Sequence, residues 1–284
     1  MSTKLYQEIQ EFYDASSNLW EGIWGEHMHH GYYGPDGNYK LDRRQAQIDL
    51  IEEVLTWADD FTTNRPQNIL DVGCGIGGSS LYLAEKFGAS VTGITLSPVQ
   101  ANRAKERAQS AGLQARTDFQ VANALDMPFA DNSFDLVWSL ESGEHMPDKV
   151  KFLQECYRVL KPGGKLIFVT WCHRPTTAAT PLRADERQHL ADIYRVYCLP
   201  YVISLPEYTE IIEQGGFKDL RVADWSTAVA PFWDVVIDST ITPQAIIGLL
   251  KAGKKTIEAA LSLQLMSEGY RSGLIRFGLV AATK

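Results

Sequence analysis

The chain has 284 residues, of which 45% are hydrophobic, and a formal net charge of -8, so it can form one large domain with a substantial core. No apolar run approaches the ~20 residues that span a bilayer, and no Lys/Arg cluster provides the basic face that nucleic acid binding requires. With no secretory leader and with four cysteines far apart and outside metal-ligand spacing, we expect a cytoplasmic protein without disulfides or a bound metal.

The first segment, residues 4–34, is too aromatic for a disordered tail. It contains Tyr6, Phe12, Tyr13, Trp20, Trp24, Tyr32 and Tyr33 together with Glu26, His27, His29 and His30. Apolar residues at helical spacing predict a helix over residues 5–12, and glycines from Gly31 onward indicate a loop. We therefore expect residues 1–40 to form a helix and an ordered cap. The histidines lack the carboxylate cluster of a metal site.

From residue 42 onward, helical and extended patterns alternate, which is typical of a parallel sheet covered on both faces. Apolar residues at three- and four-residue intervals predict an amphipathic helix over residues 42–60. We expect strands at residues 69–72, 90–95, 119–122, 134–139, 165–171, 218–225 and 274–283. We expect further helices at residues 79–87, 97–112, 150–160 and 206–214, and a turn at residues 161–164.

These elements predict an α/β fold in which a seven-stranded, mostly parallel sheet has helices on both faces. The last strand returns to the sheet, so we expect a single domain over residues 1–284 with a cofactor-binding core at residues 41–172. Prolines and mixed charges break the alternation after Cys172. We expect helical lid insertions at residues 173–204 and 228–270, before the last strand at residues 274–284.

The most informative stretch is residues 69–78, an apolar strand that runs into a glycine-rich loop and then a helix. Glycine lets the backbone approach a ligand closely, and the helix offers its N-terminus. The loop matches a dinucleotide pattern, but that pattern also needs an acid about 20 residues on, and residues 87–105 contain no Asp or Glu. Asp71, Gly73, Gly75 and Gly77 better suit a cofactor with a cationic amino-acid tail, which describes S-adenosylmethionine. A turn that simply needs glycine is the other interpretation.

The loop after the expected strand at residues 134–139 carries Glu141, Glu144 and His145. Ligands of open parallel sheets bind at the carboxyl ends of the strands, and this spacing allows two of the three side chains to enter one cleft. A carboxylate beside an imidazole is a general base with an orienting partner, and His30 and His173 are reserve candidates for the base. Helix-capping acids and a buried histidine are the alternative interpretation.

Several motifs together resemble a known family. Residues 71–77, 133–137 and 160–164 are similar to the motifs of class I S-adenosylmethionine-dependent methyltransferases, which have a Rossmann-like fold. More narrowly, residues 24–33, 93–100, 138–147 and 170–175 closely resemble γ-tocopherol methyltransferases of plants and cyanobacteria. The resemblance covers nearly the whole chain. No transit peptide precedes the first motif, so we expect the cyanobacterial type.

The resemblance implies a set of cofactor-binding residues. Asp71, Gly73, Gly75 and Gly77 would hold the methionine part, Thr95, Leu96 and Gln100 would meet the ribose and adenine, Asn123 and Ala124 would flank the adenine, and Leu140 would line the methyl-transfer cleft. Many class I enzymes have Glu or Asp where Thr95 stands. A threonine makes fewer hydrogen bonds to the ribose hydroxyls, so affinity must draw on Gln100 or on the N-terminal cap.

The resemblance also implies the reaction, which is transfer of a methyl group to a ring carbon of a prenylated phenol, converting γ- to α-tocopherol and δ- to β-tocopherol. Another prenylated benzoquinol and an indole-type amine are alternative acceptors. An NAD-dependent oxidoreductase and a non-catalytic S-adenosylmethionine-binding protein are alternatives from other classes. We expect a small lipophilic phenol as the partner, with peripheral membrane contact as a further hypothesis, and the sequence defines no oligomeric state.

Overall fold

The computed structural model describes residues 7, 9–11, 13, 14, 21, 25–59, 61–240 and 254–284. In chain order, its elements are α2 (Arg43–Ala58), β1 (Asn68–Val72), α3 (Gly78–Phe87), β2 (Ser90–Thr95), α4 (Pro98–Ser110), β3 (Thr117–Val121), β4 (Phe134–Leu140), the 3-10 helix η1 (Gly143–His145), α5 (Lys149–Val159), β5 (Leu160–His173), α6 (Ala184–Tyr197), α7 (Leu205–Gln214), β6 (Lys218–Asp224), α8 (Ser226–Val229), α9 (Pro231–Thr240), α11 (Lys254–Arg271) and β7 (Ile275–Thr283).

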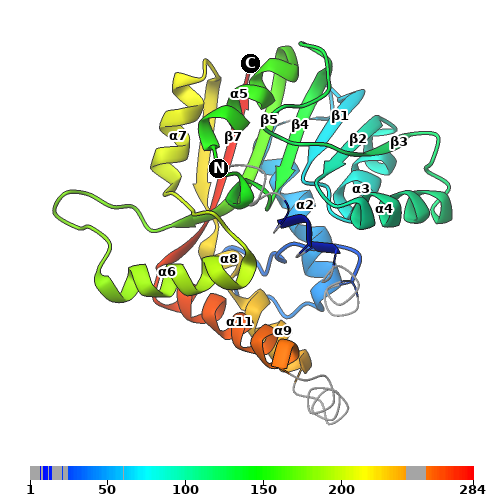
Figure 1. The fold of residues 1–284 in the computed structure, drawn as a ribbon. Helices are drawn as coiled ribbons and strands as arrows, with labels where there is room; N and C mark the ends of the chain where they lie inside the picture. The colour runs from blue at the N-terminus through cyan, green and yellow to red at the C-terminus, as the bar shows by residue number, and fades with distance from the viewer. Residues whose placement is uncertain are drawn as a thin grey trace.

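The seven strands join into one sheet in the order β3-β2-β1-β4-β5-β7-β6 (Figure 1). Strands β1 to β5 pair in parallel, whereas β7 lies antiparallel between β5 and β6. The expected seven-stranded, mostly parallel sheet is therefore confirmed. Because β1 to β5 are parallel, the loops that follow them emerge at the same edge of the sheet.

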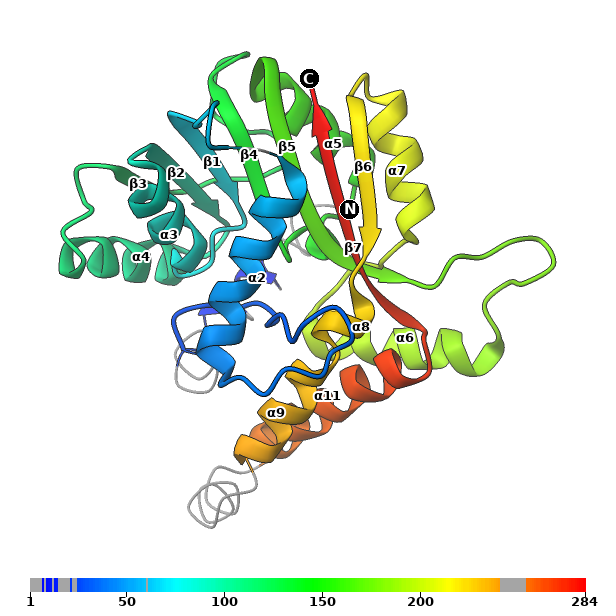
Figure 2. The ribbon, with the colours of Figure 1, turned by 180° about the vertical axis from the view of Figure 1, so that it is seen from behind.

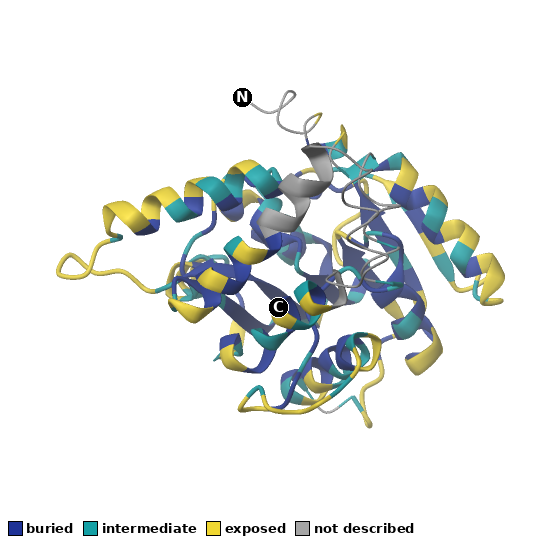
Figure 3. Ribbon diagram, turned by 90° about the horizontal axis from the view of Figure 1, so that it is seen from below, coloured by how far each residue is buried: buried dark blue, intermediate teal, exposed yellow. Residues whose placement is uncertain are grey.

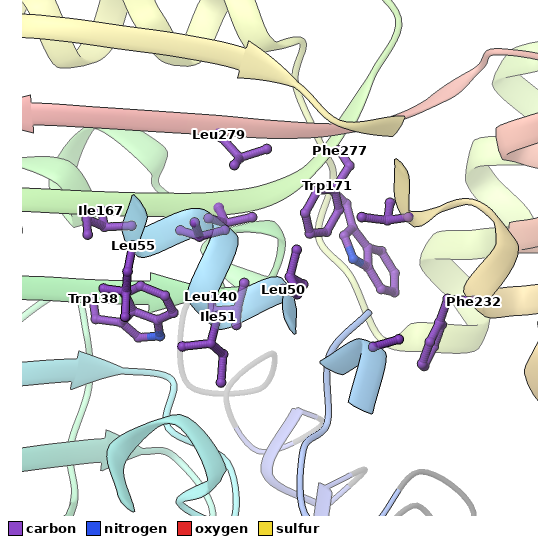
Figure 4. Close-up of a cluster of buried hydrophobic side chains, with 14 of the residues drawn as sticks. Leu50, Ile51, Leu55, Trp138, Leu140, Ile167, Trp171, Phe232, Phe277 and Leu279 are labelled. Atoms are coloured by element: carbon purple, nitrogen blue, oxygen red, sulfur yellow. The ribbon is translucent and has the colours of Figure 1, made fainter. Parts of the chain in front are cut away.

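The two faces of the sheet are covered by different helices, as the alternation of side chains along a strand requires. Ile69 lies in the buried cluster that includes α2 and α3, and Leu70 lies in the cluster that includes α5 and α7. Figure 2 shows α2 across one face, and Figure 4 shows Leu55 and Ile51 of this helix close to Trp138 of β4. Each such fully buried side chain stabilises the fold by roughly 1.5–3 kcal/mol.

A further helical layer, formed by α6, α8, α9 and α11, lies below the sheet (Figure 1). Seen from below, the central strands are buried, while helices on the outside present exposed residues on their outer sides (Figure 3). The exposed loop at residues 175–181 leads from β5 into α6. Among the residues that the structure describes, no helix is both long and apolar enough to cross a membrane.

Most expected elements are present with shifts of one or two residues at their ends, but one expectation was wrong. Residues 161–164 lie within β5 instead of forming a separate turn. Phe134 pairs with Leu160 and Leu136 with Lys165, so β5 advances five residues while β4 advances two. The glycines therefore form a bulge within a strand pair, and backbone pairing continues on both sides of it.

Some sequence expectations fall on residues that the structure does not describe. Tyr6, Phe12, Trp20 and Trp24 of the aromatic N-terminal segment lie outside the described residues, as do residues 241–253 of the second expected insertion. Within the expected N-terminal helix, Gln7 and residues 9–11 are described and helical.

Candidate active site

The loops after β1, β2, β3 and β4 surround a cleft of about 1010 Å³. Its lining includes nine of the ten residues predicted to bind the cofactor, namely Asp71, Gly73, Gly75, Thr95, Leu96, Gln100, Asn123, Ala124 and Leu140. Gly77 is the exception. A Cβ atom on Gly77 would lie 2.9 Å from the ring of Phe119, so this glycine lets the loop pack against β3 and does not face the cleft.

Gly73 and Gly75 both adopt positive φ, at 82° and 53°, but they serve different purposes. A Cβ atom on Gly73 would lie 2.2 Å from the Cβ atom of Ser142, so the bare glycine allows the loop after β1 to contact the loop after β4. A Cβ atom on Gly75 would meet only the Sδ atom of Met28, at 4.0 Å. Gly75 therefore presents open backbone to the cleft, which a ligand can approach closely.

Asp71 provides the acidic group of the loop. Its carboxylate is 2% exposed and accepts a hydrogen bond of 2.6 Å from the Oγ atom of Ser80. Burial raises the pKa of Asp71 to about 7, against the opposite effect of the Ser80 hydrogen bonds. A cation beside this carboxylate would stabilise its ionised form. The open Gly75 backbone and the buried acid together fit the amino-acid tail of S-adenosylmethionine.

The end of β2 is organised by hydrogen bonds among its own side chains. The Thr95 hydroxyl donates to Oε1 of Gln100 at 2.7 Å, and the Ser97 hydroxyl caps α4 by accepting from the Gln100 backbone N–H at 3.0 Å. The Ser97 backbone N–H donates to the Thr95 hydroxyl at 3.2 Å and not to the Gln100 side chain, so a reciprocal capping box is not formed. At the end of β3, Asn123 holds its turn by accepting from the Leu125 N–H at 3.0 Å.

Glu141 lines the cleft in an uncommon backbone conformation, with φ at 54°. Its side chain is 5% exposed and accepts from the His30 backbone N–H and Nδ1, both at 2.7 Å, and from the Trp171 indole at 2.8 Å. Burial alone would raise the pKa of this carboxyl, but the His30 side chain and backbone hold it below the usual value. Glu141 is therefore a fixed, ionised group in the cleft wall.

The expected pairing of His145 with a glutamate was wrong. Glu144 is buried outside the cleft lining and accepts from the Thr170 hydroxyl at 2.8 Å, and burial raises its pKa to about 8. His145 does line the cleft, but its Nε2 atom lies 2.6 Å from the Tyr13 hydroxyl. Because Glu141 has a left-handed backbone and Glu144 lies in a 3-10 turn, helical spacing does not predict where these side chains point.

Tyr13 is the functional residue that sequence reasoning did not single out. Burial raises the pKa of its hydroxyl and lowers that of His145 to about 3, so Tyr13 donates and His145 accepts. The Nδ1 atom of His145 then carries the ring proton, and it is buried with no hydrogen-bond partner among the described residues. The signal available in the sequence was the spacing of Ile9 and Tyr13, which places both on one helix face, and both line the cleft.

The N-terminal segment contributes further to the cleft wall through residues 26–29. Gln47 of α2 holds this stretch by donating to the carbonyls of His27 and His29 at 2.7 and 2.9 Å. These hydrogen bonds hold the described part of the segment against the cleft wall. The two reserve bases are not in the cleft lining, since His30 pairs with Glu141 and His173 contacts the Arg174 carbonyl at 2.7 Å.

The two expected lid insertions reach the cleft only indirectly. None of the described residues of segments 173–204 and 228–270 lines it. Trp233 of α9 donates its indole N–H to Nε2 of His30 at 2.6 Å, and Nδ1 of His30 contacts Glu141. The helical layer below the sheet is therefore linked to the cleft wall by two hydrogen bonds.

Comparison with known proteins agrees with this geometry. The family model of a methyltransferase domain matches residues 70–168. The chain is 48% identical to "Tocopherol O-methyltransferase, chloroplastic" of Arabidopsis thaliana, over 99% of this chain and 82% of that protein. It is 36% identical to 2-methyl-6-phytyl-1,4-hydroquinone methyltransferase of Synechocystis sp., over 95% of this chain and 85% of that protein.

A solved structure shows the same fold. The geranyl diphosphate C-methyltransferase from Streptomyces coelicolor A3(2), in complex with Mg2+, geranyl diphosphate and S-adenosyl-L-homocysteine, superposes with a TM-score of 0.78. The two chains are 21% identical, with 99% of this chain and 98% of that chain covered.

Proposed function

Because this chain belongs to the tocopherol methyltransferase family of class I S-adenosylmethionine-dependent methyltransferases, we propose that it methylates a ring carbon of a prenylated phenol, with γ-tocopherol as acceptor. Its cofactor is S-adenosylmethionine, which supplies an electrophilic methyl group on a cationic sulfur. The observation that carries the proposal is that the cofactor-binding loops share one cleft with a histidine already bonded to a phenol hydroxyl, that of Tyr13.

The acceptor has to lose a proton for the ring carbon to attack. An unperturbed phenol has a pKa of about 10, so forming the phenolate at pH 7 costs roughly three pKa units, or ~4 kcal/mol. His145 is the cleft residue placed to take this proton, because its Nε2 atom already accepts from the hydroxyl of Tyr13 at 2.6 Å. Burial lowers its pKa to about 3, so it takes the proton as the ring carbon bonds to the methyl group, which makes the phenol oxygen far more acidic. We propose that the acceptor hydroxyl binds at His145 directly, or through Tyr13.

This arrangement favours attack by carbon over attack by oxygen. A phenol oxygen that donates to His145 is engaged in proton transfer, while the neighbouring ring carbon gains electron density and stays free to meet the methyl group. Positioned base catalysis is typically worth 10²- to 10⁴-fold, whereas holding two reactants together can supply ~7–11 kcal/mol. Positioning in the cleft is therefore the larger contribution, and the base is the smaller one.

A long hydrocarbon tail also has a suitable environment beside the cleft. The rings of Trp171, Phe232, Trp233, Tyr270 and Phe277 lie within 5.9 Å of the His30 ring, measured between centroids. His30 in turn holds Glu141 in the cleft wall. Lipid and cofactor pockets are mostly apolar with few polar groups, so we propose that the helical segments 173–204 and 228–270 cover the prenyl tail.

Incubation with labelled S-adenosylmethionine tests the proposal. The panel contains γ-tocopherol, δ-tocopherol, 2-methyl-6-phytyl-1,4-hydroquinone and an indole amine, and we expect label in the two tocopherols. A carbon-methylated product still titrates near pH 10, as a phenol does, whereas an oxygen-methylated product has no phenol proton. Label in the hydroquinone or the amine alone would refute the tocopherol assignment, and loss of the phenol proton would refute attack by carbon.

A further inference from the structure

The end of β2 lacks the acid that would bind the cofactor's ribose. Thr95 stands at this position, and its hydroxyl is already committed to Gln100 at 2.7 Å. Both side chains are buried in the cleft wall. A hydroxyl that donates to a neighbouring side chain has no proton left for a ligand, and it cannot accept from two ribose hydroxyls as a carboxylate can.

The carboxylate of Asp14, from a distant part of the sequence, contacts the loop that follows β2. Asp14 accepts a hydrogen bond on Oδ1 from the hydroxyl of Ser97, the N-cap residue of α4. Ser97 lies two residues beyond Thr95 in the chain, and its backbone N–H donates to the Thr95 hydroxyl. Among the described residues, the contact of the other carboxylate oxygen of Asp14 is a long one of 3.5 Å with the Gln10 amide. Oδ2 therefore has acceptor capacity to spare at the end of β2.

Asp14 and Ser97 lie just outside the cleft lining, but neighbours of Asp14 in the N-terminal segment belong to it. Tyr13, the adjacent residue, lines the cleft, and so does Ile9, one helical turn earlier. Ion pairs hold this segment in place, since Arg103 of α4 makes two contacts below 3 Å with the Glu21 carboxylate. The position of Asp14 is thus set by contacts on both sides of it.

We propose that Asp14 supplies, from the N-terminal segment, the carboxylate that binds the ribose hydroxyls of S-adenosylmethionine in place of an acid at position 95. The inference rests on S-adenosylmethionine as the cofactor and on no particular methyl acceptor. It has a structural consequence. A ribose held by Asp14 links this part of the N-terminal segment directly to the cofactor.

Calorimetric titration with S-adenosylhomocysteine and its 2′-deoxy and 3′-deoxy derivatives tests this assignment without any methyl acceptor. Losing a hydrogen bond to a charged group corresponds to about 10- to 100-fold in affinity. We expect Asp14→Asn to weaken S-adenosylhomocysteine binding by that factor. The Asn variant keeps an acceptor oxygen for Ser97, so the cap of α4 is retained.

The deoxy derivatives separate a ribose contact from a purely structural role. In the wild-type protein at least one of them should bind about tenfold more weakly than the parent, and in Asp14→Asn this difference should vanish. Glu11→Gln, an exposed charge removal on the same segment, is the matched control and should bind like wild type.

Glu21→Gln weakens the anchoring of the segment without changing Asp14. This variant should therefore keep the full loss of affinity for the deoxy derivatives relative to S-adenosylhomocysteine. An unchanged penalty in Asp14→Asn, or wild-type affinity in that variant, overturns the inference. Because these measurements involve no acceptor, they are independent of whether tocopherols are the substrates.

Discussion

The affinity for S-adenosylmethionine should depend on pH through Asp71. Its carboxyl group is 2% exposed, and burial raises its pKa to about 7 in the cofactor-free protein. Compared with the ordinary Asp pKa of 3.8, this pKa corresponds to ~4 kcal/mol against ionisation in the folded protein. Glu141 in the same cleft is held below its usual pKa by His30. The difference arises because, within the part of the chain that the structure describes, Asp71 has Ser80 as its donor and no cationic partner.

The direction of the pH dependence follows from the linkage between proton binding and folding or ligand binding. Between about pH 4 and pH 7 the unfolded chain has lost the proton of this group and the folded protein keeps it, so the cofactor-free protein loses stability as pH rises through this range. An ammonium group next to Asp71 favours the ionised form, so binding releases a proton where Asp71 was protonated. At about pH 6, roughly one tenth of the protein has an ionised Asp71, and affinity should be about tenfold below its plateau above pH 8.

Isothermal titration of S-adenosylhomocysteine between about pH 5.5 and 8.5, in two buffers of different ionisation enthalpy, measures the affinity and the number of protons released on binding. We expect release of close to one proton near pH 6 and little near pH 8.5. Asp71→Asn should bind weakly and lose this proton release, and any change that remains belongs to the amino group of the ligand. Equal affinity at pH 6 and pH 8 in the wild-type protein, with no proton released, would refute the assignment of Asp71 as the ammonium partner.

Three further predictions concern other parts of the cleft. His145→Ala should keep cofactor affinity and lose on the order of 10²-fold or more in turnover, with residual activity rising toward the pKa of the acceptor phenol; unchanged kinetics would make His145 structural. Gly75→Val should abolish cofactor binding in a folded protein, because its side chain would enter open cleft space at a φ of 53°. Gly112→Val, at a φ of 72° with nothing near its Cβ position, imposes similar backbone strain outside the cleft lining and should bind normally in the same titration. Burial raises the Glu144 pKa to about 8, so Glu144 lowers the unfolding free energy as pH rises from about 5 to 8. Urea denaturation should therefore show that Glu144→Gln gains stability relative to the wild-type protein over this range, while the contribution of Asp71 remains in both; a constant difference between the two profiles would contradict the prediction.

The cofactor side of the cleft could be predicted from sequence because its signals are local. Asp71 lies at the end of β1 and Gly75 in the loop that follows it, and Thr95 and Gln100 lie across a single strand-to-helix junction. Parallel strands bring their carboxyl ends to one edge whatever their order. The cleft residues therefore follow from strand positions alone, and their side chains need no long-range information to be identified.

The acceptor side could not be predicted in this way, because tertiary packing chooses its partners. His145 bonds to Tyr13 and Glu141 to His30, over sequence separations of 132 and 111 residues. The positive φ of Glu141 also turns its side chain away from the direction that helical spacing predicts.

The order of the strands in the sheet and the position of Asp14 are likewise determined by tertiary packing. The sequence predicted that the last strand returns to the sheet, but not that β7 lies antiparallel between β5 and β6. Asp14 contacts Ser97, which lies 83 residues further along the chain. Its position near the end of β2 therefore depends on tertiary packing. Residue patterns within a few turns determine strands, helices and the cofactor loop, whereas the proton-transfer partners depend on contacts that exist only after distant segments have packed together.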